Sequence, residues 1–167
     1  MLDSLNRSKS VFSGDKNAAP REGEKYVVFY LDEKIYAVNC EQVIEAIGSL
    51  SSTELPLALV PDWLAGIAGL RGEIVSVVNL RKLWKKPDDV ASPENKFLVL
   101  RSKKKNYRAA FVVDKFGEMI SVAAGDIQFS AADFESSFPT FFGRADYKSQ
   151  TVFLLDAENL FLFAFGG

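Results

Sequence analysis

The stretch AGIAGLRGEIVSVVNLRKLW, residues 65–84, holds the pattern that governs the rest of the chain. A run of small and apolar residues ends at Leu70, and a run rich in Val and Ile starts at Ile74, with Arg71 and Gly72 between them. Because β-branched residues favour strands and a Gly permits a tight reversal, the stretch predicts a β-hairpin with a charge at its turn. Arg71 must then either lie in water or be fixed by a partner group.

Composition indicates an ordinary globular protein, since 48% of the 167 residues are hydrophobic and 25% are charged. A net charge of -2 and a sequence pI near 5.3 argue against a general nucleic-acid or anionic-membrane binder. The apolar stretches are shorter than the roughly 18 to 20 residues that a membrane-spanning helix needs. The first residues also lack the features of a signal peptide. We therefore expect a cytoplasmic protein without direct membrane insertion.

The chemistry available to the chain is limited because it contains one cysteine, Cys40, and no histidine. A single cysteine cannot form an internal disulfide. Without histidine the chain lacks the commonest general base and zinc ligand, and it cannot build a Ser-His or Cys-His catalytic pair. Cys40 is interpreted as a small buried apolar side chain. The sequence therefore predicts no enzyme, no cofactor and no metal site.

The first half of the chain reads as a tail followed by β-rich segments. Residues 1–24 are polar and aperiodic and predict a mobile tail, or a short peptide that folds on a partner. The expected elements that follow are a hairpin over 26–38, a short helix or strand over 39–47, a helical turn over 61–64, a short turn over 81–84 and a solvated linker over 85–96.

The second half repeats this plan. A second hairpin pattern covers residues 97–113, a strand-like segment covers 115–122, and Gly143 precedes an apolar run over 151–155. An internal repeat of about 26–84 and about 97–163 predicts two similar small β units packed together. Only the first unit shows the Arg-Gly pair at the turn, because Ala145-Asp146-Tyr147 follows Gly143-Arg144 in the second. A merely structural turn would be expected twice.

Several blocks together resemble the bacterial chemotaxis coupling (adaptor) protein family, CheW-like, over residues 25–163. They are Phe29-x-Leu31, Tyr36-Ala37-Val38, Val43-x-Glu45-x-Ile47, Pro56, Pro61, GIAGLRGEIVSVVNLR over 66–81, and Val113-Asp114. The resemblance implies a mainly β fold of two interleaved five-stranded β-barrel subdomains with a few short helices, forming one domain over 25–167. It also implies a non-catalytic cytoplasmic adaptor that couples chemoreceptors to a CheA-like histidine kinase and is recruited to membrane-associated receptor arrays.

The resemblance assigns partner contacts to a small set of residues. The expected partner-binding residues, for the kinase and the chemoreceptor cytoplasmic tip, are Val43, Glu45, Gly66, Leu70, Arg71 and Gly72. Other interpretations stay open from the residues alone: Val43 as simple core, Gly66 as a site of close backbone packing, and Arg71 as a solvent-facing side chain on a hairpin.

Two alternative functions remain at this point. A coupling protein of a pilus or phototaxis chemosensory system would carry the same motifs. A more distant alternative is a nucleic-acid-binding small β-barrel protein, because basic residues surround Tyr107, namely Arg101, Lys103, Lys104, Lys105 and Arg108. A loop between two apolar strands is also where solvated lysines normally lie, and the net charge is acidic. We therefore expect no nucleic acid as partner.

Overall fold

The structure, a computed structural model, describes residues 23–53, 59–85, 95–129 and 140–166. Nearly all of the expected tail and most of the expected linker lie outside these residues. In the described ranges the helices are α1 (Leu80–Leu83) and α2 (Ala157–Phe165), with two short 3-10 helices, Cys40–Gln42 and Ala124–Asp126. The strands are β1 (Glu24–Leu31), β2 (Lys34–Asn39), β3 (Val43–Ile47), β4 (Ser52–Thr53), β5 (Leu64–Leu70), β6 (Glu73–Asn79), β7 (Lys96–Arg101), β8 (Arg108–Val113), β9 (Lys115–Val122), β10 (Phe141–Tyr147) and β11 (Gln150–Leu155).

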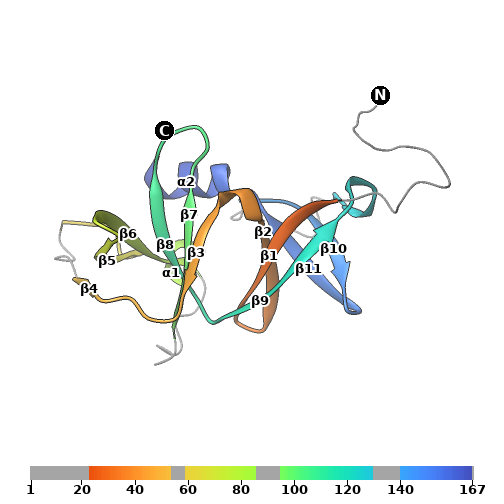
Figure 1. Ribbon diagram of the computed structural model, residues 1–167, viewed down its shortest axis with the longest axis horizontal. Coiled ribbons are helices and arrows are strands. Elements are labelled where there is room, and N and C mark those ends of the chain that lie inside the picture. Colours follow the sequence, from red (N-terminus) through yellow and green to blue (C-terminus); the bar gives the residue numbers. More distant parts are fainter. Residues whose placement is uncertain (1–22, 54–58, 86–94, 130–139, 167) are drawn as a thin grey trace.

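The strands form two sheets that exchange their central hairpins (Figure 1). The first sheet has the order β10-β11-β2-β1-β9, and the second has the order β3-β7-β8-β6-β5-β4. The β1–β2 hairpin thus sits among strands of the second half, and the β7–β8 hairpin sits among strands of the first half. In both sheets the hairpin joins its neighbour through a parallel pairing, β2 with β11 and β8 with β6. The predicted mainly β fold of two interleaved units is confirmed, with β4 as an additional two-residue strand.

Local expectations for the first half are partly confirmed. The undecided segment 39–47 is a 3-10 helix followed by strand β3, which pairs antiparallel with β7 at the edge of the sheet. The expected helical turn over 61–64 is found as one hydrogen-bonded turn and not as a helix: the Leu64 amide donates to the Pro61 carbonyl at 3.1 Å, and Leu64 already begins β5. Pairing of β5 with β6 outweighs the preference of Pro61 for a helix start. Cys40 is half-buried rather than buried.

Three apolar clusters make up the core of the described residues, and one of them joins the two sheets. One lies within the first sheet and its connections, and a second lies within the second sheet. The largest lies between them and includes residues of both sheets, α1 and α2. At its centre the ring of Tyr36 lies 5.5 Å from Phe29, 5.5 Å from Phe141 and 5.4 Å from Trp84, measured between ring centroids. The first sheet and the second sheet, called the first barrel and the second barrel below, therefore share one core.

No helix within the described ranges is long and apolar enough to cross a membrane.

Gly143 offers a test of how tightly the first barrel is packed. A Cβ there would lie 2.7 Å from Ile127 Cγ2 and 3.1 Å from the Gln128 carbonyl oxygen, which accepts the Arg144 amide at 2.9 Å. Gly143→Ala is expected to lower the free energy of unfolding by about 1–3 kcal/mol, because paired backbone must move. Gly69 is the matched control, since its Cβ would meet open space, and Gly69→Ala should change stability by less than about 0.5 kcal/mol. Urea denaturation measures both, and equal losses would contradict the expectation.

Candidate functional site

The β5–β6 hairpin closes with a two-residue turn formed by Arg71 and Gly72. Both residues have positive φ, 50° at Arg71 and 82° at Gly72. This geometry belongs to the turns whose twist matches that of an antiparallel hairpin. Gly72 adopts it without strain, whereas a non-glycine residue such as Arg71 does so at some cost. The predicted hairpin is confirmed, and the side chain of Arg71 is held at its tip.

Arg71 is both exposed and paired. Its Nε donates to Glu45 Oε1 at 2.7 Å and its second guanidinium nitrogen donates to Glu45 Oε2 at 2.9 Å. The Arg71 side chain is 74% exposed and that of Glu45 is 21% exposed. Two parallel hydrogen bonds fix the planar guanidinium in one orientation. The hydrogen bonds and charge of Arg71 hold the pKa of the Glu45 carboxyl below its usual range, and Glu45 raises the pKa of Arg71.

Glu45 and Arg71 come from strands near opposite edges of the second sheet. Glu45 lies on β3, at one edge, while Arg71 projects from the turn next to β5, near the other edge. The two side chains can meet only because the sheet curls. The bidentate pair therefore joins the two sides of the second barrel at its surface.

The structure brings the six predicted site residues into one sheet and its turn, but in different settings. Val43 begins β3, is half-buried and packs against the shared core while part of it stays exposed. Gly66 is buried where the β5–β6 register shifts, and Leu70 is half-buried against the core of the second sheet. The remaining three, Glu45, Arg71 and Gly72, form the surface pair and its turn.

A counterpart of the Arg71 turn exists in the first barrel, so the expectation that it occurs once is wrong. The register of the β10–β11 hairpin shifts between Phe141 and Gly143, as that of β5–β6 shifts before Gly66. Counting along the strand places Lys148 and Ser149 at the positions of Arg71 and Gly72, and both have positive φ.

The charge pairing is repeated as well. Lys148 Nζ lies 3.5 Å from Glu118 Oε2, and Glu118 lies on β9, the strand that corresponds to β3. This second pair carries no Arg-Gly sequence that would mark it, because the fold requires only a cation and two residues that accept positive φ. What distinguishes the second barrel is the bidentate geometry of Arg71 and Glu45, which lysine cannot supply.

A second ion cluster was not predicted, although Arg81 and Asp114 both lie in sequence blocks that carry the family resemblance. Arg81, at the start of α1, donates to Asp32 Oδ1 at 2.8 Å and to both carboxylate oxygens of Asp114 at 2.6 and 2.7 Å. The Asp114 carboxylate also accepts the Asp32 amide at 2.9 Å. Partial burial opposes the charge of Arg81, but these hydrogen bonds raise its pKa. The cluster ties α1, the β1–β2 turn and the end of β8 together.

Glu158, at the start of α2, makes the corresponding contacts with the other central hairpin. Asn79 and Asp156 cap the two helices in the same way, so Glu158 occupies the position of Arg81. Its carboxylate accepts the Ser102 hydroxyl at 2.7 Å and the side-chain amide of Gln42 at 2.7 Å, together with backbone amides of the β7–β8 loop. Partial burial opposes ionisation, yet the hydrogen bonds lower the pKa of Glu158.

The described surface is one of paired charges and half-buried apolar side chains, and within those residues no group of three His, Cys, Asp or Glu could hold a metal ion.

Residues 25–163 match the CheW-like domain family. The chain belongs to this family, and it is a non-catalytic chemotaxis scaffold, or coupling, protein.

Individual relatives agree with this assignment. Chemotaxis protein CheW of Helicobacter pylori is 23% identical over 127 residues, covering 76% of this chain and 74% of that protein. Chemotaxis protein CheW of Bacillus subtilis is 26% identical over 108 residues, covering 65% and 67%. The crystal structure of scaffolding protein TtCheW from Thermoanaerobacter tengcongensis is similar in fold, with a TM-score of 0.74 and 24% identity over 87% of this chain and 96% of that one.

Proposed function

We propose that this scaffold couples the cytoplasmic tips of chemoreceptors to a CheA-like histidine kinase. Residues 25–167 would act as one domain in the cytoplasm, recruited to membrane-associated receptor arrays. The partner-binding residues are the six named above, with Arg71 in the central role. The observation that supports this proposal is the bidentate pair of Arg71 with Glu45, which fixes a largely exposed cation at the tip of a hairpin. An exposed guanidinium held in one orientation is well suited to contact a partner.

The surface around this pair has the mixed character of a transient interface. Ile74, on the strand that follows the turn, is 77% exposed, and Gly69 opposite it in the hairpin leaves open space. The exposed Ile74 side chain lies beside Gly69, which has no side chain, and the charged pair of Arg71 and Glu45 lies nearby. This arrangement fits a protein–protein interface of modest area. In this mechanism one barrel surface docks on a homologous barrel of the kinase, while the receptor tip binds between the two barrels.

Coupling follows from simultaneous binding and requires no chemistry in the scaffold. A protein that holds kinase and receptor together raises the effective concentration of each for the other. It changes kinase activity only if it binds two kinase conformations with different affinities. The shared core between the barrels provides a rigid connection across which such a difference can be transmitted.

The proposal is tested by co-sedimentation of the chain with receptor particles and the kinase from its own organism. Arg71→Glu places two carboxylates together and should weaken association by at least about tenfold. Lys148→Glu is the matched control, because it reverses the corresponding charge of the other barrel. It should leave association within about twofold of the wild type if the first barrel's turn is not the contact.

A charge exchange separates two roles of the pair. Arg71→Glu combined with Glu45→Arg restores an ion pair but reverses the charge at the tip. If the pair only supports the barrel, the double variant should regain association, whereas direct recognition of Arg71 predicts that it does not. Failure of the wild type to associate with either partner would overturn the proposed function, and normal association of Arg71→Glu would overturn the site assignment.

A further inference from the structure

The C-terminal turn of α2 departs from the correspondence between the two halves. Helix α1 ends at Leu83 and is followed by the buried Trp84, and the buried Phe161 occupies the same position relative to its cap. Helix α2 then continues to Phe165, which adds a turn that has no equivalent after Trp84. This added turn exposes Leu162 to 53% and partly exposes Phe165. Packing of the core does not explain why large apolar side chains are exposed at this end of the helix.

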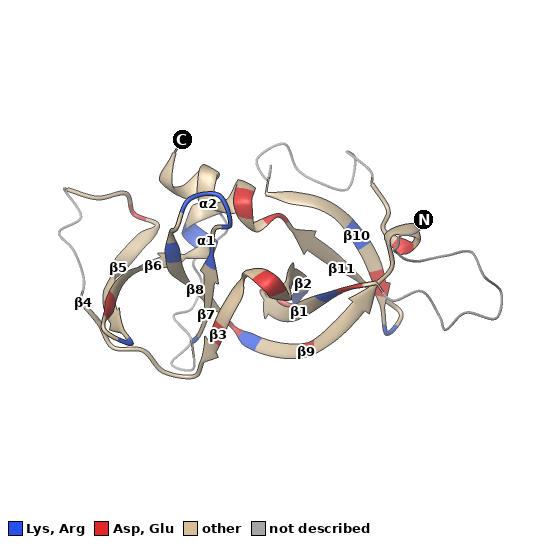
Figure 2. Ribbon diagram, turned by 45° about the horizontal axis from the view of Figure 1, so that its top comes forward, with Lys and Arg blue, Asp and Glu red and all other residues tan. Residues whose placement is uncertain are grey.

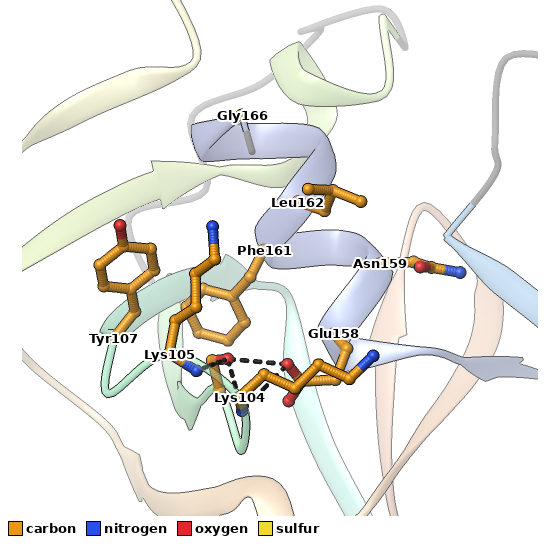
Figure 3. A pocket seen from close by; sticks show the side chains of 9 residues that line it. Lys104, Lys105, Tyr107, Glu158, Asn159, Phe161, Leu162 and Gly166 are labelled. Carbon is orange, nitrogen blue, oxygen red and sulfur yellow. Dashed lines mark hydrogen bonds between the residues drawn. The ribbon is translucent and has the colours of Figure 1, made fainter.

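The added turn forms one side of an apolar hollow whose other side is the β7–β8 loop (Figure 3). Phe161 lies at the base, and Tyr107 and Leu162 lie at the sides. Tyr107 is 47% exposed, and its ring centroid lies 6.3 Å from that of Phe165. Phe165 also contacts Trp63 edge to face, with 5.6 Å between centroids. The aromatic rings thus extend from the hollow toward β5.

The rim of this hollow is positively charged. Figure 2 shows Lys and Arg gathered in the loop beside α2, where Lys103, Lys104 and Lys105 are consecutive in the sequence. Lys104 and Lys105 line the hollow, while Lys103 is engaged elsewhere, 2.9 Å from Glu41. The acidic group at the hollow, Glu158, is occupied by hydrogen bonds from Ser102, Gln42 and loop amides. Its ionised carboxylate is half-buried and interacts with the charge of Lys104, so Lys104, Lys105 and Glu158 together leave one net positive charge at the rim for a ligand to meet.

The loop that carries these lysines is fixed in position before any ligand binds. The Ser102 hydroxyl oxygen accepts the amides of Lys104 and Lys105 at 3.2 and 3.0 Å, and the Ser102 amide donates to the Tyr107 carbonyl at 2.9 Å. Since these amides already have partners, the loop backbone is not free to bind a phosphate group. Recognition there must use the lysine side chains and the apolar hollow.

We propose that this basic, apolar hollow binds a short acidic segment of a partner protein that carries an apolar anchor. The anchor would fill the space between Tyr107 and Leu162, and flanking carboxylates would contact Lys104 and Lys105. Charge complementarity argues for this ligand and against the chain's own first segment, because residues 1–22 hold four Lys or Arg and three Asp or Glu and are thus slightly basic. The surface is built from α2 and the β7–β8 loop and does not depend on the Arg71 pair.

The test uses a fluorescein-labelled peptide, SEDELFEDES, and fluorescence anisotropy with the full chain. Two matched peptides accompany it: SKKKLFKKKS reverses the charge and SEDESSEDES removes the anchor. The acidic, anchored peptide is expected to bind, and its affinity should fall with salt. Lys104→Glu combined with Lys105→Glu should weaken it by about tenfold. Leu162→Ser should weaken it without changing the thermal midpoint greatly, because that side chain is half exposed.

A second pair of reversals provides the control. Lys25→Glu combined with Lys34→Glu changes the net charge equally at exposed positions of the other sheet and should leave binding within about twofold. Equal weakening by both pairs, or equal binding of all three peptides, would overturn the proposal. So would tighter binding of labelled oligothymidine that the Lys104 and Lys105 reversals abolish, since the surface would then bind nucleic acid. Self-association through this face, with no peptide binding, would also overturn it.

Discussion

Trp84→Ala is expected to lower the free energy of unfolding by about 3–5 kcal/mol, the largest effect among the substitutions considered. The side chain of Trp84 is buried in the core shared by the two sheets. Its ring packs on Tyr36 at 5.4 Å and on Phe141 at 5.2 Å, and these two residues belong to different halves of the chain. Removing it leaves a cavity where both barrels meet, so both should lose stability together.

The second tryptophan, Trp63, is the matched control. It is half-buried and contacts Phe165 at the edge of the core. Trp63→Ala should cost about 1–2 kcal/mol because water can reach part of the site. Urea unfolding followed by circular dichroism measures both variants. A cost for Trp84→Ala no greater than that for Trp63→Ala would show that the core between the sheets is not continuous.

Arg81→Met should give the second-largest loss, about 2–3 kcal/mol. The side chain of Arg81 is 12% exposed, and its removal leaves the carboxylates of Asp32 and Asp114 facing each other without a cation. Methionine keeps most of the volume of the aliphatic stem, so the loss reports the charge contacts rather than a cavity. The β1–β2 turn, which Asp114 also holds through the Asp32 amide, should become more mobile.

Arg108→Met is the comparison for this effect, because Arg108 pairs with Glu73 at 3.0 Å on an exposed surface. That substitution should change stability by less than about 0.5 kcal/mol. Thermal unfolding gives both values, and hydrogen exchange of the Asp32 and Glu33 amides reports the turn. A similar small change for the two variants would mean that the Arg81 cluster is solvated like an ordinary surface pair.

The strands and their connections were predictable because the pattern is local. Alternating apolar residues and the charged turn at Asp32 and Glu33 predicted the first hairpin, which the pairing of β1 with β2 confirms. The repeat predicted two similar units packed together, and the family resemblance implied that they are interleaved. Residues 39–47 were ambiguous because the strand there is specified by its partner β7, which lies far along the chain.

The site was less predictable because its contacts join distant segments. Arg71 was identified as a charge in need of a partner, but the choice of Glu45 depends on the curl of the sheet, which brings opposite edges together. The repeat of this pair at Lys148 and Glu118 has no common sequence motif. The opposite charges of Arg81 and Glu158 at equivalent positions likewise hid their shared role of anchoring a hairpin turn.

The exchange of central hairpins also bears on the order in which the protein is made. The second sheet can be completed once β8 has been synthesised, at residue 113, whereas the first sheet waits for β11, which ends at residue 155. The β1–β2 hairpin, though synthesised first, has neither of its final neighbours until β9 ends at residue 122, and it lacks β11 until residue 155. Pairing over such long separations is slow, and an unpaired strand edge is prone to aggregate. The earliest part of this domain to leave the ribosome is therefore among the last to become native, and it is the segment for which a chaperone would matter most.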